Sequence, residues 1–129
     1  MKKNKKIIKN FVQQELGCKC PEKVFDDIQW EEKEKILEID ISNQLLVNIF
    51  LNPLDKLNKK HIIDVLKVGQ KKRDYKNFNR FRLVLPAEEV KENQKKYTSI
   101  LHRLFPNDDN IHLHIIKTKQ LKKIFNIIK

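Results

Sequence analysis

Two alternating segments joined by a short link limit most strongly how this chain can fold. Residues 36–41 read ILEIDI and residues 45–51 read LLVNIFL, so apolar side chains recur at every second position. This period of two indicates β-strands with a buried face, because successive side chains of a strand point to opposite faces. The intervening Ser42-Asn43-Gln44 predicts a turn, and the two strands therefore form a hairpin.

Helical and strand patterns alternate after the hairpin. Proline marks three boundaries: Pro53 ends the second strand, Pro86 starts a helix and Pro106 stops it. The elements expected there are a helix at 54–72, a strand at 79–85, a helix at 87–104, a strand at 110–117 and a last helix with Leu121, Ile124, Phe125 and Ile128. Helical spacing also predicts a helix at 4–16 and a short second helix behind Pro21.

This order of elements predicts a single α/β domain over residues 1–129. Strands that are joined through helices pair in parallel by right-handed crossovers. We therefore expect a mixed four-stranded sheet, with an N-terminal β-hairpin followed by a parallel βαβαβ unit, and helices at both ends of the chain. The chain is long enough to bury a hydrophobic core without disulfides or metals.

The alternation also predicts which strand residues are buried. One face of the sheet should hold the main core: Leu37, Ile39, Leu45, Val47, Ile49, Phe81, Leu83, Leu85, Leu113 and Ile115. The other face should then gather the polar strand residues Glu38, Asp40, Asn48, Arg80, Arg82, His112 and His114. Carboxylates, arginines and histidines on one surface could serve acid–base or metal chemistry. The chain has no glycine-rich phosphate loop and no G-x-S-x-G elbow, so the sequence leaves open whether it is an enzyme.

The two cysteines stand one residue apart, in the segment LGCKCP. Gly17 suits the left-handed end of the first helix, and Pro21 suits the first position of the next. Cys20 would then lie at or near the N-cap of that second helix. The positive end of a helix dipole, with Lys19 beside it, lowers the pKa of a thiol.

Three interpretations of Cys18 and Cys20 stay open. Both can be free structural thiols in a reducing compartment, or they can form a strained and easily reduced disulfide. They can also bind zinc, which needs two further ligands. The candidates are His112 and His114, which share one face of a strand, although this spacing is not an established zinc pattern.

A basic segment with interleaved aromatic residues is the clearest binding signal. Three of the four arginines of the chain fall within KVGQKKRDYKNFNRFR, residues 67–82. Arginine binds phosphate or carboxylate through two parallel hydrogen bonds, and aromatic rings beside cations are typical of single-stranded nucleic-acid sites. The residues expected to bind an anionic ligand are Lys71, Lys72, Arg73, Tyr75, Lys76, Arg80 and Arg82.

The overall charge is weaker evidence for an anionic partner than this local pattern. The net charge is +11, but lysine outnumbers arginine 24 to 4, a bias that an AT-rich genome produces whatever the function. No apolar run approaches the roughly 18 residues of a membrane span, and polar residues interrupt the N-terminal segment where a signal peptide would be apolar. We therefore expect a cytoplasmic protein, and the sequence is compatible with a homodimer.

The phrases LGCKCPEKVF and FNRFRLVLP are similar to segments of small prokaryotic proteins without an assigned activity. The resemblance implies a compact, self-standing domain and no particular reaction. The sequence as a whole favours a binding module for an anionic partner, either nucleic acid or a phosphate-bearing ligand. The alternative is a thiol-redox or zinc-binding protein that uses Cys18 and Cys20.

Overall fold

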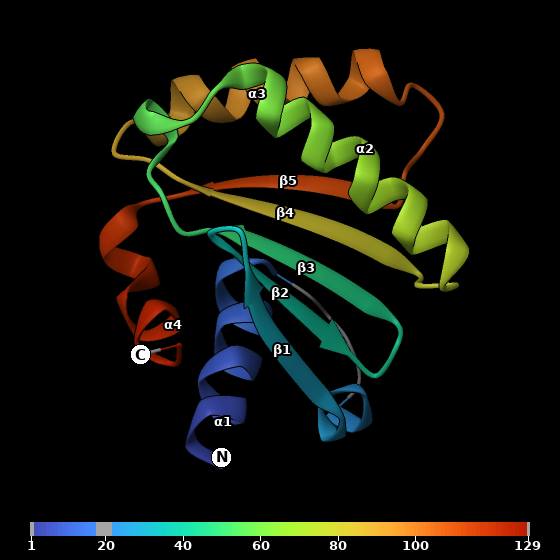
Figure 1. The fold of residues 1–129 in the computed structure, drawn as a ribbon, viewed down its shortest axis with the longest axis vertical. Coiled ribbons are helices and arrows are strands. Elements are labelled where there is room, and N and C mark those ends of the chain that lie inside the picture. Colours follow the sequence, from blue (N-terminus) through green and yellow to red (C-terminus); the bar gives the residue numbers. More distant parts are fainter. Residues whose placement is uncertain (1, 18–21, 129) are drawn as a thin grey trace.

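The chain forms a three-layer α/β domain, with the sheet between two pairs of helices (Figure 1). A computed structural model describes residues 2–17 and 22–128. The main elements are α1 (Lys2–Asn10), β1 (Ile28–Lys33), β2 (Ile36–Ile41), β3 (Leu45–Phe50), α2 (Lys59–Tyr75), β4 (Arg80–Pro86), α3 (Val90–Leu104), β5 (Ile111–Ile116) and α4 (Lys122–Asn126). Short helical turns are η1 (Phe11–Glu15), η2 (Glu22–Asp26), η3 (Leu54–Lys56) and η4 (Thr118–Leu121).

The sheet confirms the predicted fold class. Its strands lie in the order β1-β2-β3-β4-β5, with antiparallel pairing from β1 to β3 and parallel pairing from β3 to β5. The sheet has five strands rather than four, because residues 28–33 form β1. Only a single 3-10 turn, η2, stands where a second helix was expected.

The first helix has the predicted extent, since α1 continues through a π-helical turn, η1, as far as Glu15. Gly17 has a φ of +67°, the left-handed conformation expected at this point. The helix predicted at 54–72 is shifted towards the C-terminus. Asn58 caps α2 by accepting a hydrogen bond of 2.8 Å from the N–H of Lys60, and the residues before it form the separate turn η3.

The core lies on both faces of the sheet, which corrects the expectation of a single buried face. Side chains from β2 and β3 pack with α1 and α4: Leu37, Ile39, Leu45, Val47 and Ile49. Side chains from β4 and β5 pack with α2 and α3: Phe81, Leu83, Leu85, Leu113 and Ile115. The register explains this split, because Val47 pairs with Arg82 and Leu46 with Phe81. Every residue of β3 is buried, so its alternation cannot tell which face meets which layer.

The same register divides the polar residues that were expected to share one surface. Asn48 pairs with Leu83, so it belongs to the α2–α3 face, as do Glu38 and Asp40. Arg80, Arg82, His112 and His114 belong to the face of α1 and α4. Arg82 and Leu83 point to opposite sides of β4, as predicted. The expected single surface of carboxylates, arginines and histidines is therefore wrong.

A glycine sets the distance between α2 and the sheet. Gly69 faces Phe81, and a Cβ placed on Gly69 would lie 2.2 Å from the Cζ atom of that ring. Only glycine permits so close an approach.

In the described part of the chain, no helix is long and apolar enough to cross a membrane.

Candidate functional site

The fold distributes the seven predicted anion-binding residues over two sides of the molecule. Lys71, Tyr75 and Lys76 lie on or directly after α2 and are exposed. Lys72 forms an ion pair with Glu38 of β2. Arg80 is exposed at the start of β4, whereas Arg73 and Arg82 are buried.

Two large hydrophobic side chains on the solvent-facing side of α2 are exposed to solvent. Tyr75 is 86% exposed and Val68 is 64% exposed. They are seven positions apart, close to two helical turns, so they lie on one face of the helix, with Lys67 and Lys71 beside them. We call Lys67, Val68, Lys71, Tyr75 and Lys76 the α2 surface.

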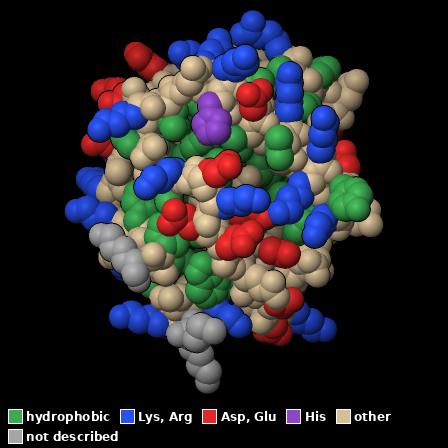
Figure 2. All heavy atoms as spheres, in the orientation of Figure 1, with side chains coloured by type: hydrophobic (Ala, Val, Ile, Leu, Met, Phe, Trp, Pro, Cys, Tyr) green, Lys and Arg blue, Asp and Glu red, His purple; other side chains and the backbone are tan. Residues whose placement is uncertain are grey.

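The lysines of the α2 surface are not neutralised by carboxylates. Among the described residues, no carboxylate oxygen lies within 4.0 Å of the ammonium groups of Lys67, Lys71 or Lys76. Asp64 shares the exposed side of α2, so the charge there is reduced but stays positive. Figure 2 shows Lys and Arg side chains spread over the α2–α3 layer, with acidic side chains near the middle of the view.

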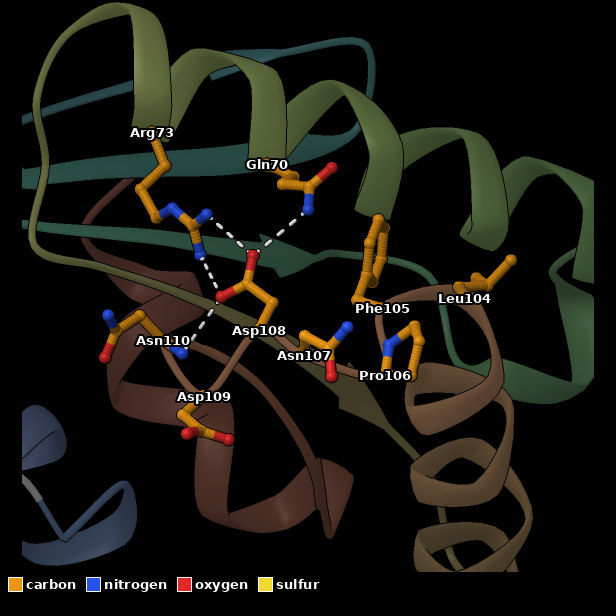
Figure 3. A pocket seen from close by; sticks show the side chains of 9 residues that line it. All are labelled: Gln70, Arg73, Leu104, Phe105, Pro106, Asn107, Asp108, Asp109 and Asn110. Carbon is orange, nitrogen blue, oxygen red and sulfur yellow. Dashed lines mark hydrogen bonds and ion pairs between the residues drawn. The ribbon is translucent and has the colours of Figure 1, made fainter.

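Arg73 has a different role, because Asp108 holds its guanidinium group (Figure 3). Its Nη1 and Nη2 atoms donate hydrogen bonds of 2.7 and 2.6 Å to the two oxygens of that carboxylate. Gln70 Nε2 and the N–H of Asn110 each donate a further bond of 3.0 Å to Asp108. The hydrogen bonds from Arg73 lower the pKa of Asp108 to about 2. These contacts tie the end of α2 to the loop before β5.

A hollow of about 700 Å³ adjoins this clamp, with Leu104, Phe105 and Asn107 in its lining (Figure 3). It lies where β5 begins, at the amino ends of the parallel strands. Ligands of open α/β sheets usually bind beyond the carboxyl ends. Both oxygens of Asp108 are already occupied, so we interpret the clamp as a structural junction.

Arg82 is an unusual residue, because it is buried without a carboxylate partner in the described chain. It is 6% exposed, and its Nε atom has no hydrogen-bond partner among residues 2–17 and 22–128. Its Nη1 atom lies 3.2 Å from the carbonyl oxygen of Leu16 and 2.9 Å from Nε2 of His114. A guanidinium group can only donate, so Nε2 of His114 is the acceptor and the proton of this ring is on Nδ1. Arg82 thus binds the last turn of the N-terminal helix to the sheet.

Burial keeps the histidines near Arg82 neutral at pH 7. It lowers the pKa of His114 to about 4, and the nearby Arg82 adds to this shift. Burial also lowers the pKa of His112, with Arg82 again the second cause. Burial and the charge of Arg80 lower the pKa of Arg82 itself, but a guanidinium group remains charged.

The proposed zinc ligands are described only in part. Cys18 and Cys20 lie outside the described residues. His112 and His114 lie together on the side of β5 that faces Arg82. Within residues 2–17 and 22–128, no group of three or more His, Cys, Asp or Glu side chains could hold a metal ion. A zinc ion at His114 would stand beside a buried guanidinium cation, which opposes binding.

Two features of these sites escaped the sequence analysis. Asp108 gives no local signal, because its partner Arg73 is 35 residues away. Val68 could have been found, since it lies outside the apolar stripe of α2 and seven residues before Tyr75.

No family model matches this chain, and comparison with curated proteins and with solved structures also gives no match. The resemblance of LGCKCPEKVF and FNRFRLVLP to small prokaryotic proteins therefore stays a prediction.

Proposed function

We propose that the α2 surface binds an anionic partner, with single-stranded nucleic acid the leading candidate. The observation that carries the proposal is the exposure of Tyr75, 86%, beside lysines that have no carboxylate partner in the described chain. Bases stack on exposed aromatic rings while lysines contact the phosphates.

A homodimer through the same surface is less favourable. Val68 and Tyr75 offer an apolar contact, but a two-fold interface would bring the lysines of both copies together. Like charges across an interface oppose association, whereas a polyanion is attracted by them. Charge complementarity therefore favours the anionic partner.

The proposal is tested by the salt dependence of binding to a labelled single-stranded oligonucleotide, followed by fluorescence anisotropy. The double substitution K67Q/K71Q should weaken binding about tenfold and reduce the slope of log K against log salt by roughly one unit. The matched control is K91Q/K95Q, which removes two exposed lysines with the same spacing from α3. Equal losses in both variants, or binding that ignores salt, would contradict the proposal.

Substitutions of Tyr75 distinguish the contribution of base stacking to binding from that of charge. Tyr75→Ala should weaken binding by about 1 to 3 kcal/mol, while Tyr75→Phe keeps the ring and most of the affinity. If Tyr75→Ala instead abolishes self-association seen in sedimentation experiments, the α2 surface is a dimer contact.

A second candidate function is thiol chemistry at Cys18 and Cys20. The observation in its favour is that Arg82 binds the carbonyl of Leu16, and Gly17 is the last described residue before the cysteine segment. A cation near a thiol favours the reactive thiolate.

The rate of alkylation as a function of pH tests this second candidate. Arg82→Gln should raise the apparent pKa of the more reactive thiol, and Arg82→Lys should restore part of the effect. If the pair binds zinc instead, metal analysis will find it and the thiols will be protected until a chelator is added. If both thiols are unreactive and no metal is found, thiol chemistry and zinc binding are both excluded, and Cys18 and Cys20 have a structural role.

A further inference from the structure

A separate cavity lies between the N-terminal and C-terminal helical segments, on the side of the sheet away from the α2 surface. Its volume is about 340 Å³, within the range of ligand pockets. Figure 1 shows α1 and α4 side by side under the sheet. The cavity is lined by Ile7, Asn10, Phe11, Gln14, Glu15, Lys119, Gln120, Lys123 and Ile124.

The cavity has an apolar floor that belongs to the hydrophobic core. Phe11 is 5% exposed and Ile124 is 1% exposed, and both pack with the strands of this face. Ile7 is half-buried against the same cluster. Ile7 is therefore the more accessible apolar side chain of the lining, and an apolar group that entered the cavity would replace water against Ile7 and the exposed edge of Phe11, which is favourable.

One wall of the cavity is the π-helical turn η1. The N–H of Leu16 bonds to the carbonyl of Phe11 at 3.2 Å, five residues back, instead of four as in an α-helix. Such turns are rare and occur frequently at functional sites. Here the widened turn contributes Phe11, Gln14 and Glu15 to the lining.

The opposite wall carries two lysines on consecutive helical turns. Lys119 and Lys123 are four residues apart and both are exposed. No carboxylate in the described part of the chain lies within 4.0 Å of either ammonium group. Glu15 is the acidic residue of the lining, so two cations face one anion.

We propose that this cavity binds a small amphiphilic anion. Its apolar chain packs against Ile7 and the exposed edge of Phe11, and its carboxylate lies between Lys119 and Lys123. A free phosphate would leave the apolar floor unused, and a neutral lipid would leave the lysines unused. The site is distinct from the α2 surface, because its helices cover the other face of the sheet.

Three probes separate the two parts of the site, with binding measured by calorimetry and by amide NMR shifts. Decanoate should bind and shift the amides of Phe11, Gln14 and Ile124. Decanol lacks the charge and butyrate lacks the chain, so both should bind at least tenfold more weakly. Each pair of methylene groups removed from decanoate should weaken binding by up to roughly tenfold.

Variants then locate the binding. K119Q/K123Q should weaken decanoate binding about tenfold and leave decanol binding unchanged, whereas K91Q/K95Q on α3 should leave both unchanged. Gln120→Trp places a bulky ring at an exposed position of the lining and should abolish decanoate binding without changing the unfolding midpoint.

Equal affinity for decanoate and decanol, or equal losses in the two lysine pairs, would overturn the proposal. Shifts spread over the surface that appear only at millimolar probe would show an adventitious additive only, and would overturn it as well.

Discussion

Arg73 and Asp108 join two parts of the chain that the topology leaves separate. Their hydrogen bonds of 2.7 and 2.6 Å connect the last turn of α2 to the loop between α3 and β5. Arg73 is 8% exposed, and the partners of its side chain within the described part of the chain are both acidic, Asp74 and Asp108. The pair therefore ties the end of α2, the first crossover helix, to the loop that leads into the edge strand β5.

Removing the charge of Asp108 should destabilise the fold. Asp108→Asn leaves the Arg73 cation buried with Asp74 alone, and breaking a buried pair in this way costs about 2 to 4 kcal/mol. Urea denaturation followed by circular dichroism measures the loss. Asp109→Asn is the matched control, because this neighbour is exposed and should change stability by less than about 0.5 kcal/mol. Equal effects of the two substitutions would show that the clamp is not stabilising.

The sequence predicted the order of the later elements because each carries its own local signal. Proline boundaries and apolar spacing identified α2, β4, α3 and β5, and the hairpin of β2 and β3 followed from alternation. These signals lie within a few residues of one another, and they need no knowledge of partners.

The first strand was missed because it is a charged edge strand. Of its six residues, Ile28 is buried, Trp30 is half-buried and the other four are exposed. The strand ends in three charged residues, EEK at positions 31–33. The turn after it gave no signal either, since Glu34 and Lys35 adopt φ values of 53° and 64° where asparagine and glycine are usual. Edge strands carry charges to avoid pairing with other chains, which hides their period.

The distribution of the candidate sites could not be predicted, because it depends on register. A shift of one residue in the pairing of β3 with β4 would exchange the faces of Arg82 and Phe81 relative to the hairpin. The sequence predicted that Arg73 is an exposed ligand of phosphate. In the structure it is buried and binds Asp108 instead. Only the α2 surface is local, since helical spacing alone brings Val68 and Tyr75 together.

The contact between Gly69 and Phe81 should make alanine unfavourable at a helical position. Alanine normally stabilises a helix relative to glycine by about 1 kcal/mol. A Cβ at residue 69 would lie 2.2 Å from the ring of Phe81, so Gly69→Ala must displace α2 or the ring. We expect a net loss of about 1 to 3 kcal/mol in urea denaturation.

A double substitution tests this cause. Phe81→Leu removes the ring atoms that the new Cβ would meet, so Gly69→Ala should cost less in a Phe81→Leu background. Additive losses would show that the cost arises elsewhere. Val68→Ala, at the exposed neighbouring position, should have little effect on stability.

Gln94 protects the outer edge of β5. Its Oε1 atom accepts a hydrogen bond of 2.8 Å from the N–H of Ile115, and its Nε2 atom donates one of 2.8 Å to the carbonyl of Leu113. One carboxamide thus occupies backbone groups that a further strand would use, and a covered edge resists pairing with another chain.

Opening this edge should promote association. Gln94→Ala should lower stability by about 1 to 2 kcal/mol and increase oligomers in size-exclusion chromatography with light scattering. Gln94→Glu can accept from Ile115 but cannot donate to Leu113, so it should give a partial effect. Lys95→Ala is the control on the same helix. A monomeric Gln94→Ala protein of unchanged stability would show that the carboxamide does not protect the edge.

The histidine beside Arg82 should make stability depend on pH in a defined window. The pKa of His114 is about 4 in the folded protein, against an ordinary value of 6.5, mainly because of burial. The unfolded chain therefore binds this proton more readily, and stability falls as the pH drops from 6.5 through 4. The loss from His114 is at most about 3 kcal/mol.

His114→Gln should remove most of this slope, because glutamine cannot titrate but still offers Arg82 an acceptor. His112, whose pKa is lowered in the same direction, should leave a smaller residual slope. Asp108 acts in a separate window. Its pKa is about 2 rather than 3.8, so its stabilisation is present above pH 4 and is lost only as the pH falls towards 2. Urea denaturation between pH 7 and pH 3 should thus show a slope above pH 4 that His114→Gln reduces and Asp108→Asn leaves in place. An unchanged slope in His114→Gln would mean that the ring is not held neutral by its place beside Arg82.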